Sequence, residues 1–262
     1  MKRMKKVIKG ICVLLVICLI AVVGFEGYKY FKYKSGIPIL GYHNVVSDED
    51  KAKYHRGDIY TMAVSDFEKQ MKYLADNQFN TLSLGEVTEW YEGRMELPLK
   101  SVVITFDDGF ETFNTIVKPI LEKYNLKATC FVIGVLCQDE PDFYEYLKQD
   151  QLVNTQNVEY YSHSYNLHVS TGMFEKKIET LTTEEIKQDF AANKGIVDDR
   201  YFAYPFGRPS KTSREVLVEN GTIMGYGYAQ NRRATRSDDR YLMPRFLMYS
   251  FMNMTWFKWI VD

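Results

Sequence analysis

The chain has 262 residues, 46% of them hydrophobic and 26% charged, with a formal net charge of −1 at pH 7. This length allows one sizeable core, and the composition excludes a disordered or low-complexity chain. Five positive and no negative side chains fall within residues 1–25, so residues 26–262 carry −6, that is −1 less 5. A mildly acidic domain is a poor match for a polyanion, and we expect no nucleic-acid partner.

The first 25 residues differ in composition from the rest of the chain. Five basic residues precede or interrupt the start of an apolar run that is unbroken over Ile11–Val23. A helix over Val7–Phe25 would span about 28 Å, close to the hydrocarbon thickness of a bilayer. We expect residues 1–25 to be an uncleaved signal anchor that crosses the cell membrane once, with 26–36 as a juxtamembrane linker and 37–262 as an extracellular domain. A cleaved signal peptide, and hence a secreted protein, is the alternative.

Strand-like and helix-like patterns alternate through the rest of the chain, which indicates an α/β fold with a mainly parallel sheet and crossover helices. Two capping boxes, at Ser65 and Thr182, predict helix starts. The Asn220-Gly221 pair predicts a helix end. The predicted strands cover residues 37–42, 81–84, 102–106, 128–133, 158–162, 201–204, 224–229 and 246–249, and the predicted helices cover 65–77, 86–91, 112–124, 182–193, 210–219 and the C-terminal end with Trp256 and Trp259.

The cysteines do not predict a disulfide framework. Cys12 and Cys18 lie in the apolar N-terminal run, and Cys130 lies in the strand predicted at 128–133. Cys130 and Cys137 could pair outside the cell, but we expect two buried free thiols.

The strand at 102–106 ends in two adjacent carboxylates, Asp107 and Asp108, followed by Gly109. Neighbouring side chains of a strand point to opposite faces, so these two would normally diverge. Gly109 can adopt backbone angles that other residues avoid, which would allow both carboxylates to face one cleft. Sites in parallel α/β folds are built at the carboxyl ends of strands. The alternative is that one aspartate merely caps the following helix.

Three of the four histidines, His43, His163 and His168, come just after predicted strands. His163 and His168 are five residues apart, which does not put them on one helix face. A loop after a strand can still bring two such imidazoles together. With one strand-end carboxylate they would form a His₂Asp set that leaves one metal position open to water. The alternative is two unrelated polar histidines in a tyrosine-rich loop.

The segments TFDDGF, SHSYNLH and FAYPFG, in this order and at these intervals, resemble the metal-dependent polysaccharide deacetylases (NodB-homology, chitin-deacetylase-like carbohydrate esterases). The resemblance runs from about Ile37 to the C-terminus. The histidine spacing and the AYPFG segment are most similar to the branch that removes N-acetyl groups from poly-N-acetylglucosamine in biofilm exopolysaccharide. The resemblance implies a distorted (β/α) barrel and a hydrolase of amide bonds with a divalent metal, first of all Zn²⁺, with Co²⁺, Ni²⁺ or Fe²⁺ also accepted by such a site. Its partners would be an N-acetylated polysaccharide and exopolysaccharide synthesis machinery, and the N-terminal helix would add the membrane as a partner.

The resemblance also implies roles for individual residues. Asp107 would be the general base, which takes a proton from a water acidified by the metal, and His43 the general acid that protonates the leaving amine. The backbone N–H of Phe206 would stabilise the oxyanion. Tyr204 and Pro205, which precede it, would contact substrate. The implied metal ligands are Asp108, His163 and His168.

One position departs from the family pattern. The family usually has an arginine three residues before the oxyanion aromatic, where this chain has Ala203. Arg245, from another strand, is our candidate for the missing guanidinium, and Arg208 is the second. Alternative functions are a peptidoglycan N-deacetylase or an O-acetyl esterase of the same fold, and an inactive polysaccharide-binding or assembly protein.

Overall fold

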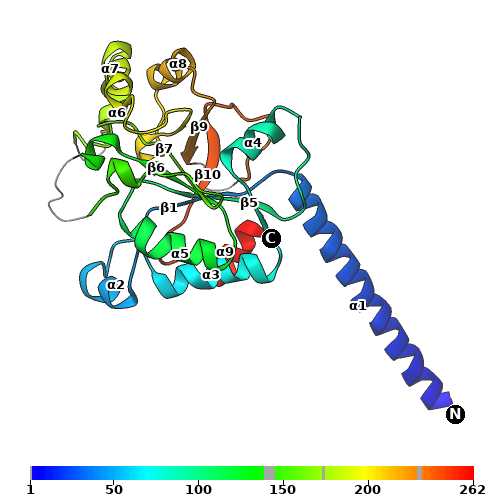
Figure 1. Cartoon of the computed structure of the whole chain (residues 1–262). Coiled ribbons are helices and arrows are strands. Elements are labelled where there is room, and N and C mark those ends of the chain that lie inside the picture. The colour runs from blue at the N-terminus through cyan, green and yellow to red at the C-terminus, as the bar shows by residue number, and fades with distance from the viewer. Residues whose placement is uncertain (1, 139–144, 173–174, 229–231) are drawn as a thin grey trace.

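A computed structural model of the chain describes residues 2–138, 145–172, 175–228 and 232–262. A long helix, α1 (Lys2–Lys34), leads away from a barrel that the rest of the chain forms (Figure 1). Within the described residues, no helix combines the length and apolar character that crossing a membrane requires, so the transmembrane helix predicted over residues 1–25 is not confirmed.

The barrel consists of seven parallel strands within the described residues, and it confirms the predicted α/β barrel. The closing pair joins β1 to β5, with Leu40 opposite Ile104, while Leu40 faces Phe246 on the other side. All the loops that follow these strands therefore gather at one end of the barrel. The strands in spatial order are β1 (Ile39–Tyr42), β10 (Met243–Leu247), β9 (Met224–Tyr228), β8 (Tyr201–Ala203), β7 (Val158–Ser162), β6 (Ala128–Val132) and β5 (Ser101–Phe106).

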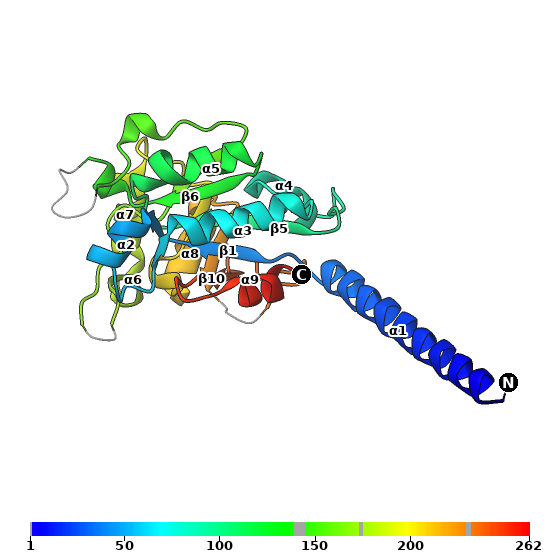
Figure 2. The same ribbon diagram turned by 90° about the horizontal axis from the view of Figure 1, so that it is seen from below.

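Helices cover the barrel on two sides (Figures 1 and 2). On one side lie α3 (Val64–Asp76), α5 (Lys118–Lys123) and α9 (Met254–Val261), and on the other α7 (Thr183–Asn193) and α8 (Lys211–Asn220). The remaining elements are α2 (Asp48–Tyr54), α4 (Leu84–Tyr91), α6 (Lys177–Thr180), β4 (Asn80–Thr81), which extends β5, and the small sheet of β2 (Asn44–Val46) and β3 (Thr61–Ala63).

The core follows the predicted apolar patterns. Phe67, Met71 and Leu74 of α3 are buried in one cluster with alternate residues of β5, as their helical spacing predicted. Cys130 and Cys137 are buried free thiols, as expected.

Helix starts show which capping predictions were right. α7 begins with the predicted capping box at Thr182, and Gly221, with φ +78°, ends α8. The capping box predicted at Ser65 is wrong, because α3 begins at Val64 with Ala63 as its N-cap and no side-chain cap. A carboxylate oxygen of Asp48 accepts the hydrogen bond from the backbone N–H of Ser65, so a neighbouring helix satisfies this donor instead.

Several predicted elements differ in extent. The strand at 81–84 is shortened to β4 because Ser83 forms a capping box that starts α4. The last strand lies at Met243–Leu247 rather than 246–249, since its pairing with β9 begins at Met243. The helix predicted at 112–124 starts as a π-helix (Phe113–Val117) before α5. The strand predicted at 224–229 ends at Tyr228, and position 229 lies outside the described residues.

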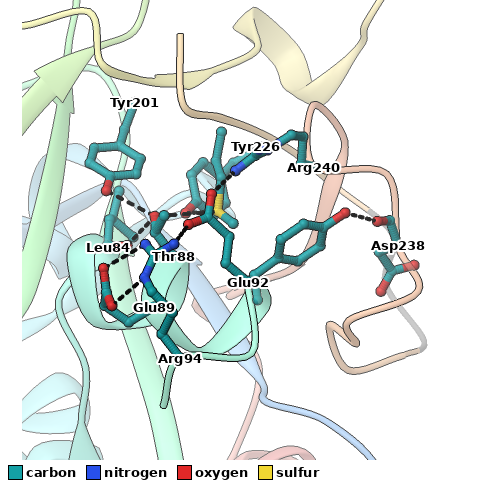
Figure 3. A network of polar contacts seen from close by, with 11 residues as sticks. Leu84, Thr88, Glu89, Glu92, Arg94, Tyr201, Tyr226, Asp238 and Arg240 are labelled. Atoms are coloured by element: carbon teal, nitrogen blue, oxygen red, sulfur yellow. Dashed lines mark hydrogen bonds and ion pairs between the residues drawn. The ribbon is translucent and has the colours of Figure 1, made fainter.

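The loop after β9 is fastened to α4 at the end of the barrel where the strands begin (Figure 3). Arg240 of this loop lies 2.7 Å from a carboxylate oxygen of Glu92, which also pairs with Arg94. The Tyr91 hydroxyl donates to the carbonyl of Asp238 at 2.8 Å. These contacts close the barrel opposite to the strand ends that carry the predicted site residues.

Candidate active site

The backbone turns sharply after β5, and this turn separates the two aspartates. Asp108 and Gly109 both have positive φ, +75° and +80°. Such angles are unfavourable for an aspartate and readily adopted by glycine. A Cβ on Gly109 would also lie 2.8 Å from a methyl carbon of Val132. As a result Asp107 is buried within the barrel, while Asp108 lines an open cleft.

Asp107 is held by a buried arginine and a tyrosine. The Arg245 guanidinium donates to both carboxylate oxygens, at 2.7 and 2.8 Å, and the Tyr228 hydroxyl donates to one of them at 2.7 Å. Asp107 is 1% exposed and Arg245 is fully buried. Burial is the largest single effect on the pKa of Asp107 and raises it, but the charge and hydrogen bonds of Arg245, together with the other groups around the carboxylate, outweigh burial and hold the pKa well below the usual range. Asp107 is therefore ionised at neutral pH.

Asp108, His163 and His168 form a cluster with the geometry of a metal site. Their facing ligand atoms all lie within 4.8 Å of one another. The Nε2 atoms of His163 and His168 lie 3.5 and 3.6 Å from Asp108 Oδ1, a buried oxygen that has no hydrogen-bond partner within the described residues. A bound cation would satisfy this buried carboxylate oxygen, which lies between two imidazoles and has no other partner within the described residues.

The protonation state of His163 supports the same reading. Its Nδ1 lies 2.7 Å from the carbonyl oxygen of Ala203 and donates to it, so its Nε2 presents a lone pair to the cluster. Burial lowers the pKa of His163 to about 4, so the ring is neutral at neutral pH. Metals bind neutral imidazole, and a carbonyl acceptor on the second nitrogen is the usual support of such a ligand.

The loop that carries His168 is fixed by a carboxylate from α7. The two oxygens of Asp189 accept hydrogen bonds from the backbone N–H groups of Tyr165 and Asn166, at 2.8 and 2.7 Å. Asp189 is largely buried, so these bonds are shielded from water. The bonds hold the loop between the two histidines in one conformation, which explains how ligands five residues apart converge.

A cleft of about 560 Å³ opens above this cluster. The Phe206 backbone, at φ +59°, turns at the cleft, and its ring stacks on His168 with centroids 4.0 Å apart. The Lys176 ammonium lies 4.4 Å from the centre of the same ring. The residues that line the cleft are His43, Asn44, Asp58, Tyr60, Thr61, Asp108, Phe110, His168, Lys176, Phe206, Arg208, Tyr228 and Leu247.

The structure brings together most of the residues singled out from the sequence. His43, Asp108, His168 and Phe206 share the cleft, and Asp107, His163 and Arg245 lie buried beside it. Ala203 is buried at the end of β8, and its carbonyl oxygen accepts the hydrogen bond from His163 Nδ1. The second arginine candidate, Arg208, lies elsewhere in the cleft wall, 3.6 Å from Glu179.

The two residues predicted to contact substrate, Tyr204 and Pro205, have buried side chains. Tyr204 is fully buried, and its hydroxyl donates to the carbonyl of Tyr241 at 2.8 Å. Pro205 is also buried. Both residues directly precede Phe206 in the chain, and their role as substrate contacts stays a prediction.

Three residues of this site were not identified from the sequence. Tyr228 and Tyr60 line the cleft, and Asp189 supports the histidine loop. Tyr228 is the last residue of β9, so its position at a strand end was a usable signal. Asp189 carries no such signal, because an aspartate in an amphipathic helix is ordinarily part of the solvated face.

Comparisons with known proteins identify the family and the fold. The sequence profile of the polysaccharide deacetylase family matches residues 94–224, half of the chain. The poly-β-1,6-N-acetyl-D-glucosamine N-deacetylase of Staphylococcus aureus is 26% identical over 199 residues, which cover 72% of this chain and 68% of that protein. The solved structures of IcaB from Ammonifex degensii and of the Streptococcus pyogenes deacetylase PplD share the fold, with TM-scores of 0.72 and 0.71. Each is 23% identical, and each comparison covers 87% of this chain and 98% of the other. The chain belongs to the polysaccharide deacetylase family, whose members are hydrolases that remove acetyl groups from glycans.

Proposed function

We propose that the chain removes N-acetyl groups from a β-linked N-acetylglucosamine polymer, an exopolysaccharide of the poly-N-acetylglucosamine kind. The observation that carries this proposal is the convergence of the Asp108, His163 and His168 ligand atoms within 4.8 Å, beside an ionised and immobilised Asp107. The choice of polymer is supported by the similarity to the staphylococcal poly-β-1,6-N-acetyl-D-glucosamine N-deacetylase.

The ligand cluster suits a divalent cation with one open position. Asp108, His163 and His168 would hold it, and Zn²⁺ is the first candidate for two imidazoles and one carboxylate, with Co²⁺, Ni²⁺ or Fe²⁺ as alternatives. When bound, such a metal polarises the acetyl carbonyl and lowers the pKa of a nearby water.

The remaining residues of the site would transfer protons and stabilise negative charge. Asp107 is ionised and held rigidly by Arg245 and Tyr228, so it can accept the proton of the attacking water without reorienting. In the cleft, His43 has a buried Nδ1 with no hydrogen-bond partner within the described residues, and it would protonate the amine that leaves. The Phe206 backbone N–H would stabilise the oxyanion, since this residue turns at the cleft beside His168.

Acetate release from N-acetylglucosamine oligomers by the purified full chain tests the proposal. We expect release that a chelator abolishes and added Zn²⁺ or Co²⁺ restores, with His168→Ala inactive and His55→Ala as a matched histidine control. Release from peptidoglycan but not from the oligomers would point to the peptidoglycan enzyme, and release only from O-acetylated glycans to the esterase. Glycan binding without any release would show an inactive binding or assembly protein.

The cellular location stays a prediction. The basic and apolar sequence of residues 1–25 supports an extracellular domain anchored in the membrane, where it would meet a newly exported polymer and its synthesis machinery. Protease accessibility of the domain on intact cells, compared with that on lysed cells, tests this part independently of the activity.

A further inference from the structure

A row of four aromatic rings leads out of the cleft over the protein surface. It consists of Tyr60, Tyr249, Phe251 and Trp256, and we refer to it as the aromatic row. The Tyr60 ring lies 5.1 Å from the His43 ring inside the cleft. From there the successive ring centroids are 6.0, 5.1 and 6.2 Å apart, and the Tyr249 and Phe251 rings are stacked at 9°.

The aromatic row is exposed although its side chains are large and apolar. Tyr60 is 45% exposed, Phe251 59% and Trp256 53%. Exposed apolar side chains are ordinary singly, but a contiguous set of them marks an interaction surface. The row therefore offers a surface that suits a ligand with apolar faces.

Hydrogen bonds hold the two loops that carry Tyr60, Tyr249 and Phe251, while Trp256 lies on α9. The backbone N–H of Ser250 donates to the carbonyl of Ile59 at 2.8 Å, and the Ser250 hydroxyl donates to the carbonyl of Asp58 at 3.1 Å. The Lys51 ammonium donates to the carbonyls of both His55 and Asp58. Because these bonds join the loop before β3 to the turn before α9, the rings keep their positions without being buried.

The surface beside the row is concave and shares a lining residue with the cleft. A second hollow of about 660 Å³ is lined by Phe251, Ile59 and Arg56, among others. Asp58 lines both this hollow and the catalytic cleft. A ligand that leaves the cleft past Tyr60 would thus enter a groove with aromatic rings and both a carboxylate and a guanidinium.

We propose that the aromatic row binds the uncharged pyranose rings of the substrate strand beyond the residue being deacetylated. This inference rests on the proposed function, because it takes that strand as the ligand. The apolar C–H face of a pyranose can stack on an aromatic ring, and the row offers several such rings in succession outside the cleft. Asp58 and Arg56 would meet the hydroxyl and acetamido groups. A lipid surface is the other partner for exposed aromatics, but it needs no concave groove that leads into the cleft.

The test measures how deacetylation depends on oligomer length in single-alanine variants. Phe251→Ala and Trp256→Ala are compared with wild type as full chains, on N-acetylglucosamine oligomers of two to eight sugars. Trp259→Ala is the matched control, because Trp259 is on the same helix and 64% exposed but lines a different hollow, with Ser35 and Phe246. Binding of the hexamer to each chelator-treated protein is measured in parallel by calorimetry.

We expect KM for the long oligomers to rise about three- to tenfold in Phe251→Ala and Trp256→Ala, with kcat little changed and the effect fading for the dimer. Trp259→Ala should match wild type. An equal loss at all lengths, or no loss, overturns the proposal. The proposal is also overturned if the variants bind phosphatidylglycerol vesicles more weakly than wild type while their kinetics on the hexamer are unchanged. That result would assign the row to the membrane. If wild type releases no acetate, the proposed function fails, and the calorimetric comparison alone decides whether the row binds glycan.

Discussion

Replacing Arg245 by glutamine should be among the most damaging single substitutions in the barrel. The guanidinium and the Asp107 carboxylate are both buried and joined by two hydrogen bonds of 2.7 and 2.8 Å. At an effective dielectric constant of about 20, charges about 4 Å apart attract by about 4 kcal/mol. Removal of one partner of a buried pair costs about 3–5 kcal/mol, because the other charge stays buried without compensation. We therefore expect Arg245→Gln to lower the free energy of unfolding by about that amount.

Urea unfolding of the full chain at pH 7 measures this loss. The folded pKa of Asp107 lies below its ordinary value, so the stability from this pair is fully present above the ordinary carboxyl pKa and is lost only as the pH falls through the folded value. Arg200→Gln is the matched control, because Arg200 also forms a two-pronged pair, with Asp198, but its side chain is 60% exposed. Arg200→Gln should lower the free energy of unfolding by less than about 1 kcal/mol.

A double variant separates two contributions to the destabilisation: the lost attraction between Arg245 and Asp107, and the cost of leaving the Asp107 charge buried without a partner. Arg245→Leu combined with Asp107→Asn removes both charges and should be more stable than Arg245→Gln, although it should release no acetate. Arg245→Gln itself should lower kcat at least about a hundredfold, because Asp107 loses its fixed position. The reasoning is refuted if Arg245→Gln is as mild as Arg200→Gln, or if the double variant is less stable than the single one.

Three further outcomes follow from the site. Tyr228→Phe should lower kcat about tenfold with KM nearly unchanged, and it should lower the free energy of unfolding by about 1.5–3 kcal/mol, since a buried hydrogen bond to the Asp107 carboxylate is lost; an altered KM would instead indicate a substrate contact. Asp189→Ala should weaken metal binding about 10- to 100-fold, measured by chelator competition, because the His168 loop loses two hydrogen bonds; unchanged affinity would show that the loop is rigid without them. The metal-free protein should lose about 2 kcal/mol of its free energy of unfolding between pH 7 and pH 5. In this range His163 binds a proton in the unfolded state but stays neutral in the folded state, where burial lowers its pKa to about 4. His163→Gln should flatten this dependence in urea titrations, and a slope that persists would contradict the assignment.

The parts of the site that lie close together in sequence were predictable. Asp107, Asp108 and Gly109 end a strand whose apolar pattern is unambiguous, and the glycine implied the turn that the positive φ angles confirm. The histidine pair follows β7 in the same way. In both cases a strand end fixes where the side chains go, and parallel strands bring their ends together.

Features that depend on distant contacts were not predictable to the same degree. The start of α3 depends on Asp48, a residue of another helix that accepts a hydrogen bond from Ser65. A tertiary contact, and not the local capping pattern, therefore determines where this helix begins. The burial of Tyr204 depends likewise on packing between β8 and α8, whereas its place in the AYPFG segment suggested exposure at the cleft.

The arginine in the barrel interior shows why a motif position can change while the chemistry stays the same. Arg245 on β10 and Tyr228 on β9 are paired in register, so both side chains enter the barrel at the same level and reach Asp107 together. Space for the tyrosine comes from two glycines, since a Cβ on Gly41 would lie 2.6 Å from its hydroxyl and a Cβ on Gly207 2.3 Å from its ring. The carboxylate needs a buried guanidinium at its two oxygens, and a closed parallel barrel can supply that group from any strand whose side chain points inward at this level. A small residue at position 203 is therefore compatible with an intact base.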